Sequence, residues 1–269
     1  MPGPRQADGK QGVKLGFVGS GSIASAIVTG LRAAGNADPI EMSPLNAKVA
    51  ADLADRFENV QVAPTNQAVL DASDVVVLAV RPQIAPIVLP ELRFRPDQHV
   101  VSLIPTLSLG YLRSVTAPAA VVTRAVPLPS VARRQGPTAI YPPSEPIKAI
   151  FDLLGSAIEL DNESEFDAFT TATAVIASYF ALADVVTGWM TRHGAAPEKA
   201  QAFVSEMLRG LTETSPAAPG RSFAALAEEY QTRGGLNEQV LRAIADLGMF
   251  VALENALDAV LERLAAAHK

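Results

Sequence analysis

Two glycines near the start of the chain, Gly19 and Gly21, have the spacing of a phosphate-binding turn. They follow a short, mostly apolar run at residues 13–18 and precede a segment with helical periodicity. A turn without side chains lets backbone N–H groups approach a pyrophosphate, and the positive end of the helix dipole favours the anion. The pattern G-x-G-x-x-A between a predicted strand and a predicted helix indicates dinucleotide binding. The residues expected to bind the cofactor there are Gly19, Gly21, Ser22, Ile23 and Ala24.

The elements that must position this turn alternate between strand and helix. The predicted strands lie at residues 13–18, 40–42, 60–62, 74–80, 100–103, 121–126 and 136–141, and the predicted helices at residues 22–34, 45–57, 84–92 and 107–115. Such alternation favours an α/β fold with a doubly wound, mostly parallel sheet covered by helices on both faces. The run at residues 74–80 is typical of a buried parallel strand, and it ends in Arg81-Pro82 at the carboxyl edge, where cofactors bind in such folds.

After residue 160 the predicted strands stop and the chain becomes helical. Helical patterns cover residues 165–193, 197–211 and 249–267, shorter helices begin near residues 222 and 236, a Pro-rich loop covers 215–220 and a break covers 230–235. We therefore expect an α/β domain at residues 12–161 and an all-helical domain at 162–269. Apolar residues on several faces of these helices predict a homodimer formed through this half.

Composition limits the partners and the location of the protein. A net charge of −6 disfavours nucleic acid or an anionic membrane as the main partner. The absence of cysteine excludes thiolate sites, and three widely separated histidines predict no metal site. Residues 1–11 lack the apolar core of a signal peptide and predict a disordered leader. The apolar run 172–190 carries Asp184 and several threonines, so we interpret it as a buried core or subunit-interface helix of a cytoplasmic protein.

The turn after the second predicted strand bears on which dinucleotide binds. In folds that prefer NAD, an Asp or Glu closes this strand and holds the ribose 2′-hydroxyl. Here Glu41 lies just inside the strand, and the turn offers Ser43. A carboxylate would repel a 2′-phosphate, whereas the Ser43 hydroxyl can bind one. This favours NADP(H), although Ser43 is also a candidate N-cap for the next helix.

On these motifs the chain resembles the pyrroline-5-carboxylate reductase family over nearly its whole length. The matching segments are residues 16–24, 66, 78–82, 101–102, 234–235 and 247–256. The resemblance implies an NADPH-dependent reductase of the C=N bond in a small cyclic imino acid, as in proline biosynthesis. It also implies a Rossmann domain, a helical domain that interlocks between two subunits, and an active site between the two domains. The residues that it places along the cofactor are Ser43 and Asn66 at the adenosine end, and Ala79, Val80, Pro82 and Ser102 at the sheet edge.

The departures from the family gather on the substrate side. The family's M-P-N-T-P-A is V-P-L-P-S-V at residues 126–131, and its G-S-G-P-A-Y is A-V-I-A-S-Y at residues 174–179. Its S-P-G-G-T-T is T-R-G-G-L-N at residues 232–237. The resemblance matches Asn237 to a threonine that touches the substrate nitrogen.

Hydride transfer to an imine needs little from the protein, because the charge of an iminium substrate does the activating. A hydrogen-bonding side chain suffices, and we assign that part to Asn237, with Thr232 beside it. Gly234 and Gly235 can present backbone N–H groups to a carboxylate, and Arg233 can bind one through two hydrogen bonds. Structural alternatives stay open for all of them: a helix N-cap for Asn237, a solvated charge for Arg233 and a plain turn for the glycines.

Tyr179 and Tyr230 are the other candidate proton donors, and Tyr179 is also expected among the substrate-binding residues. Two other functions stay open: an NADP(H)-binding protein without catalysis, and a related reductase that acts on another imine or an oxoacid. The altered residues 127–129 and Asn237 motivate the first of these.

Overall fold

The computed structural model describes residues 12–217 and 220–268, so the predicted leader at residues 1–11 lies outside the described residues. Within this range the chain forms two compact units. The first contains residues up to Thr171 together with residues from Leu261 onward, and the second contains Ala172–Val260. The division thus falls later in the chain than the expected domain boundary between residues 161 and 162.

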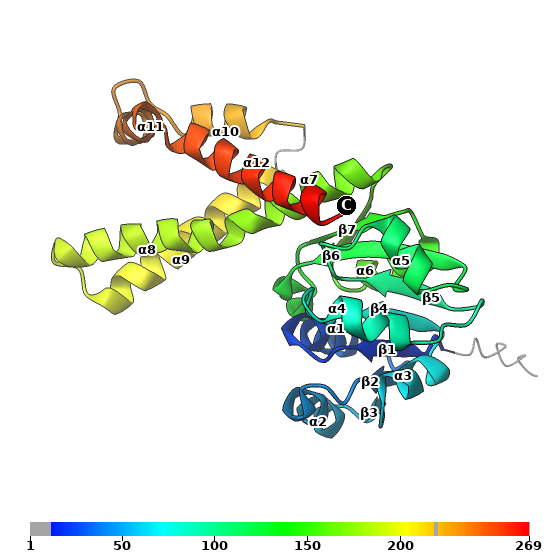
Figure 1. Cartoon of the computed structure of the whole chain (residues 1–269). Coiled ribbons are helices and arrows are strands. Elements are labelled where there is room, and N and C mark those ends of the chain that lie inside the picture. Colours follow the sequence, from blue (N-terminus) through cyan, green and yellow to red (C-terminus); the bar gives the residue numbers. More distant parts are fainter. Residues whose placement is uncertain (1–11, 218–219, 269) are drawn as a thin grey trace, which may run out of the picture. The chain divides into compact units, whose positions relative to one another are not determined.

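An eight-stranded sheet forms the centre of the first unit (Figure 1). Its strands are β1 (Leu15–Val18), β2 (Ile40–Met42), β3 (Val60–Val62), β4 (Val75–Leu78), β5 (His99–Ser102), β6 (Val121–Pro127), β7 (Pro137–Tyr141) and β8 (Ser156–Glu159). They lie in the order β3-β2-β1-β4-β5-β6-β7-β8, and only β6 and β7 pair antiparallel. The order 3-2-1-4-5-6 is that of a doubly wound dinucleotide-binding sheet, which confirms the predicted fold class.

Helices cover this sheet on both faces. They are α1 (Ser22–Ala33), α2 (Ala47–Arg56), α3 (Asn66–Ala72), α4 (Ala85–Val88), α5 (Leu109–Val115), α6 (Glu145–Asp152) and α7 (Glu163–Ala172), with the 3-10 turns η1 (Leu89–Glu91) and η2 (Pro129–Arg133). The segment predicted as one helix at 84–92 is divided into α4 and η1. Pro90 has no N–H with which to continue the helical hydrogen bonds, so the segment tightens into a 3-10 turn.

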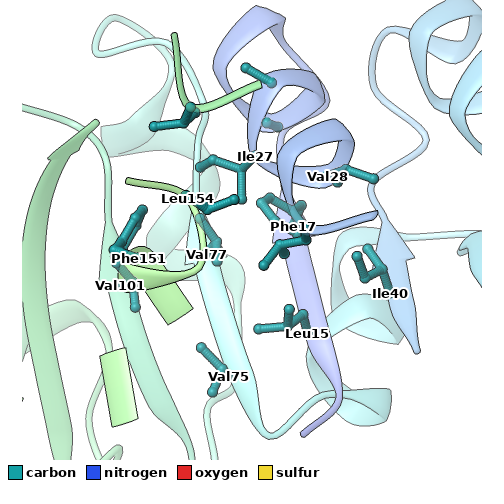
Figure 2. Close-up of a cluster of buried hydrophobic side chains, with 14 of the residues drawn as sticks. Leu15, Phe17, Ile27, Val28, Ile40, Val75, Val77, Val101, Phe151 and Leu154 are labelled. Atoms are coloured by element: carbon teal, nitrogen blue, oxygen red, sulfur yellow. The ribbon is translucent and has the colours of Figure 1, made fainter. Parts of the chain in front are cut away.

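The core consists of two hydrophobic clusters, one on each face of the sheet. Alternate residues of β4 supply them: Val75 and Val77 belong to one cluster, and Val76 and Leu78 belong to the other. Figure 2 shows the first cluster, in which Phe17 of β1 lies beside the side chains of α1. Because both faces are buried, the strands read as continuous apolar runs, which is why they were predictable from sequence.

The second unit is helical. Its elements are the 3-10 turn η3 (Thr173–Val175), α8 (Ile176–Arg192), α9 (Pro197–Ala217), α10 (Phe223–Glu229), α11 (Leu236–Asp246) and most of α12 (Met249–Ala267). The segment predicted as one helix from residue 165 to 193 is interrupted by η3. Helix α9 continues to Ala217, so the prediction that a loop begins at residue 215 is wrong, and residues 218–219 lie outside the described range.

The segment Glu163–Arg192 is long and apolar enough to cross a membrane by length and composition alone, which is a weak indication. Only 11% of its most apolar window is buried within the chain. Helix α8 has no buried residue, so its interpretation as a core helix is wrong. The other interpretation, a helix that packs against a second subunit, stays a prediction.

Candidate functional site

The glycine turn after β1 packs directly against the end of β4. Gly19 has a φ of +105°, a conformation that favours glycine, and a Cβ there would lie 2.6 Å from the carbonyl oxygen of Ala79. The same Cβ would lie 2.8 Å from the backbone nitrogen of Val80. The turn therefore reaches the carboxyl edge of the sheet between β1 and β4, at the point where the strand order reverses and ligands bind in such sheets.

The backbone beyond this turn has the features of an anion site. Gly21 is the N-cap of α1, and a Cβ built on it would meet no atom within 4 Å. It has no side chain to accept from the first N–H groups of the helix, and the first turn contains no acidic residue. These N–H groups and the positive end of the helix dipole thus suit the diphosphate of a dinucleotide.

Ser43 and Asn66 lie together at the ends of β2 and β3. The hydroxyl of Ser43 donates to Oδ1 of Asn66 at 2.7 Å and accepts from the N–H of Leu45 at 3.3 Å. Ser43 is fully buried, and Ser20 donates to its carbonyl oxygen at 3.3 Å. The N-cap of α2 is Asn46, so the alternative that Ser43 caps this helix is wrong. Asn66 is half-buried, and its Nδ2 has no hydrogen-bond partner among the described residues.

The remaining predicted cofactor residues lie at the carboxyl ends of β4 and β5. The N–H of Ala79 donates to the carbonyl of Val18 at 2.8 Å, which continues the pairing of β1 and β4. Val80 is buried and Pro82 is half-buried. Ser102 ends β5, is 1% exposed, and its hydroxyl accepts from the N–H of Ile104 at 3.3 Å. The first unit thus gathers these residues along one edge of the sheet.

A buried ion cluster around Arg124, at the middle of β6, was missed by sequence reasoning. The guanidinium of Arg124, whose side chain is 1% exposed, donates to Glu163 at 2.8 Å and to Asp167 at 3.1 Å. It also donates to the carbonyl of Pro105 at 2.9 Å and lies over the ring of Phe166. The cluster joins α7 to the loop after β5. Its signal in the sequence is a lone arginine in an apolar strand, with two carboxylates one helical turn apart further on.

The second glycine turn, Thr232–Gly235, is closed by hydrogen bonds within the chain. Gly234 has a φ of +73°, and its N–H donates to Oε2 of Glu238. The N–H of Gly235 donates to the carbonyl of Thr232 at 2.7 Å. Gly235 is the N-cap of α11, so the alternative that Asn237 is the N-cap is wrong.

The side chains around this turn differ in how they are held. Nδ2 of Asn237 donates to the carbonyl of Tyr230 at 2.9 Å, and Oδ1 has no hydrogen-bond partner among the described residues. Arg233 is exposed, and its side chain has no hydrogen-bond or ion-pair partner among the described residues. Thr232 is also exposed. The hydroxyl of Tyr230 lies 3.3 Å from that of Thr214 on α9.

Tyr179 belongs to a different part of the second unit. It is 40% exposed, stands edge-to-face with Phe180, and lines a cavity of about 490 Å³ between α8 and α9. Gly234 and Gly235 line another cavity, of about 390 Å³, along α11. Within this unit, therefore, the predicted substrate residues Thr232–Asn237 lie in one turn and Tyr179 lines a separate cavity. Among the described residues, no cluster of three or more His, Asp or Glu side chains could hold a metal ion.

Two family models match this chain. Residues 14–106 match NADP oxidoreductases described as coenzyme F420-dependent, and residues 163–267 match the pyrroline-5-carboxylate reductase dimerisation domain. Among curated relatives, the pyrroline-5-carboxylate reductase of Pseudomonas aeruginosa is 27% identical and covers 94% of this chain and 96% of its own. Pyrroline-5-carboxylate reductase 2 of Bacillus subtilis is 25% identical and covers 94% of each chain.

Solved structures share the fold of this chain. The 1-pyrroline-5-carboxylate reductase of Streptococcus pyogenes superposes with a TM-score of 0.83 at 22% identity, over 95% of this chain and 99% of that one. The Plasmodium falciparum pyrroline carboxylate reductase, with NADP bound, gives a TM-score of 0.84 at 18% identity, over 97% and 100%. At these identities the comparison shows a shared fold, that is, the same arrangement of strands and helices, and nothing beyond it.

Proposed function

Since the chain belongs to the pyrroline-5-carboxylate reductase family, we propose that it reduces the C=N bond of a small cyclic imino acid with NADPH. The observation that carries the proposal is the uncapped N-terminus of α1 behind Gly21, in a chain that reductases of this name match over 94% of its length. An anion site without acidic neighbours fits a dinucleotide diphosphate. A protein that binds NADP(H) without catalysis is not favoured.

At the cofactor site, the first N–H groups of α1 hold the diphosphate. Oδ1 of Asn66 accepts from the buried Ser43 hydroxyl, so Nδ2 of Asn66 is the free donor of this pair, and we assign it to the 2′-phosphate. Bound NADPH supplies the hydride. Ala79, Val80 and Pro82 in the segment after β4, together with Ser102 at the end of β5, would hold the nicotinamide end along the sheet edge.

At the second glycine turn, Asn237 holds the imine nitrogen of the substrate in its protonated form. Its Nδ2 donates one hydrogen to the carbonyl of Tyr230, and Oδ1 has no partner among the described residues. A side-chain amide gives and accepts hydrogen bonds but has no acidic proton to transfer. A protonated imine carries its own N–H donor and positive charge. Addition of hydride to the carbon of the protonated imine yields the amine directly. Asn237, with Thr232 beside it, keeps the imine N–H oriented.

A homodimer formed through the helices of the second unit completes the proposal. The second unit exposes large apolar side chains to water, and a subunit interface would bury them. The most exposed are Phe180, Val185, Trp189, Phe203, Phe223, Leu236, Val240, Leu247 and Val251. The match of residues 163–267 to a dimerisation domain supports this assembly. We also propose a cytoplasmic location, where such an enzyme draws on NADPH.

The test is NADPH oxidation by the purified protein with 1-pyrroline-5-carboxylate, with product analysis for proline. Absence of oxidation with every cyclic imino acid tried would overturn the proposal. Asn237→Ala should lower turnover by about tenfold or more while NADPH affinity stays unchanged, since the side chain acts on the substrate only. Unchanged turnover would leave Asn237 a structural role alone.

A further inference from the structure

We infer that this chain binds the carboxylate of its substrate through the side chain of Arg233, because Glu238 and the carbonyl of Thr232 already accept from the N–H groups of the two glycines in the turn. The inference rests on the proposed function and concerns how the same site selects carboxylated substrates. Glu238 is a positioning residue in this scheme, and Arg233 is the ligand of the anion.

Neither glycine N–H of the turn is free to bind an anion. The N–H of Gly234 donates to the carboxylate of Glu238, and the N–H of Gly235 donates to the carbonyl of Thr232. A hydrogen already directed at a carboxylate is a poor donor to a second one, and the two anions would also repel each other. A substrate carboxylate can therefore reach the N–H of Gly234 only by displacing Glu238, and that of Gly235 only by displacing the carbonyl of Thr232.

Glu238 is held firmly in its place. Its other carboxylate oxygen accepts from Nη2 of Arg242 at 2.9 Å, one helical turn along α11. It is the third residue of the helix, where a carboxylate satisfies a free N–H and interacts favourably with the helix dipole. Its side chain is 25% exposed, against 72% for Arg242. Displacing it would cost both hydrogen bonds.

The charged side chains beside the turn also disfavour the binding of an anion to its backbone N–H groups. The cavity along α11 is lined by Gly234, Gly235, Glu238, Gln239, Arg242, Ala243 and Asp246. Two carboxylates thus face one guanidinium, and that guanidinium is already paired with Glu238. Arg233 lies outside this lining, and within residues 230–246 of the described chain it is the basic side chain without an ion-pair partner. A planar, bidentate guanidinium is well suited to a carboxylate.

The test compares two substrates that differ only in the carboxylate, 1-pyrroline-5-carboxylate and 1-pyrroline. Arg233→Ala should raise KM for the first by about tenfold or more, since a charge-assisted pair is lost, and leave KM for the second unchanged. Arg233→Lys should give a KM for 1-pyrroline-5-carboxylate between those of the unmodified protein and Arg233→Ala, because lysine keeps the charge but cannot make the two parallel hydrogen bonds of a guanidinium. Binding of proline and pyrrolidine to the NADP-loaded protein, followed by thermal shift, should show the same discrimination without turnover.

A double variant separates the positioning role of Glu238 from a merely structural one. In Arg233→Ala/Glu238→Ala the freed N–H of Gly234 can bind the carboxylate, so KM for 1-pyrroline-5-carboxylate should recover several-fold relative to Arg233→Ala alone. Asp246→Ala, which removes a carboxylate from the same cavity without touching the turn, should give no such recovery. Circular dichroism of each variant checks that α11 is intact.

Two results would overturn the inference. One is an equal change of KM for both substrates in Arg233→Ala; the other is an unchanged preference for the carboxylated substrate in active Arg233→Ala protein. Failure of the proposed function looks different, because the unmodified protein would then oxidise NADPH with neither imine and bind neither proline nor pyrrolidine.

Discussion

The hydroxyl of Ser43 donates to Oδ1 of Asn66 at 2.7 Å and thereby orients the amide of Asn66. With Oδ1 engaged, Nδ2 is the group left to meet a ligand at the ends of β2 and β3. A donor in this place suits a 2′-phosphate, and the buried serine positions it.

Asn66→Asp tests this arrangement with almost no change in shape. The carboxylate can still accept from Ser43, but the donor toward the ligand is replaced by negative charge. We expect the ratio of NADPH to NADH affinity to fall by about tenfold or more, measured by fluorescence titration. Ser43→Ala, which frees the amide to rotate and removes the acceptor of the Leu45 N–H but adds no charge, should change the ratio less. An unchanged ratio in Asn66→Asp would mean that the 2′-phosphate is held by other residues.

Gly19 and Gly21 should respond differently to the same substitution. In Gly19→Ala the new methyl meets the backbone at Ala79 and Val80 at a φ of +105°, so the protein should lose about 1–3 kcal/mol of stability as well as cofactor affinity. In Gly21→Ala the methyl meets open space within the chain, so stability should hold while NADPH binding weakens. Urea unfolding and NADPH titration of both variants check this, and equal stability loss would contradict it.

Arg124 should contribute much more to the free energy of unfolding than an arginine paired on the surface. Arg124→Met removes the cation from Glu163 and from Asp167, whose side chain is 11% exposed, and should cost about 3–5 kcal/mol in the free energy of unfolding. Arg209→Met is the matched control, because Arg209 pairs with two carboxylates on an exposed face of α9 and should give no measurable change. Similar values for the two variants would refute the prediction.

Glu41 should make stability depend on pH in the acid range. Burial raises the pKa of its carboxyl group, and the charge of Lys14 offsets this only partly. A folded pKa above the unfolded value, about 4.3 for glutamate, means that ionisation costs more in the folded state. The cost is therefore present at neutral pH and disappears as the pH falls below the unfolded pKa.

The variant Glu41→Gln should accordingly unfold at higher urea concentration than the natural protein at pH 7, and this advantage should vanish near pH 4. Lys14→Met should act in the opposite direction at pH 7, since it removes the attraction that partly offsets burial. An advantage for Glu41→Gln that is the same at both pH values would show that ionisation is not its cause.

The proposed dimer predicts that a charge on the exposed face of α8 will separate the subunits. Val185 is 63% exposed on this helix, and Val185→Asp would bury an unpaired carboxylate in a subunit interface. Light scattering after size exclusion should show a dimer for the natural protein and a monomer for the variant. Thr191→Asp, near the end of the same helix, serves as the control for added charge. A natural protein that is monomeric at micromolar concentration would rule the dimer out.

Local patterns were enough to predict the α/β half of this protein. The spacing of Gly19, Gly21 and Ala24 predicts a turn, because the geometry of that turn is set by the backbone of a few adjacent residues. The apolar run at residues 74–80 reports burial on both faces of the sheet. In both cases the physical cause lies within the segment itself, so the sequence carries it.

Side-chain partners were decided by the tertiary structure. The contacts of Ser43 with Asn66 and of Arg124 with Asp167 join residues that are 23 and 43 positions apart, and only the packing of strands and helices brings them together. The glycine turn at residues 232–235 was expected to offer its N–H groups to a ligand, and the structure shows Gly234 bound to Glu238 instead. Which acceptor a given N–H takes depends on the three-dimensional positions of all its competitors. The sequence by itself determined the cofactor fold, and the tertiary structure decided which polar groups remain free for a ligand.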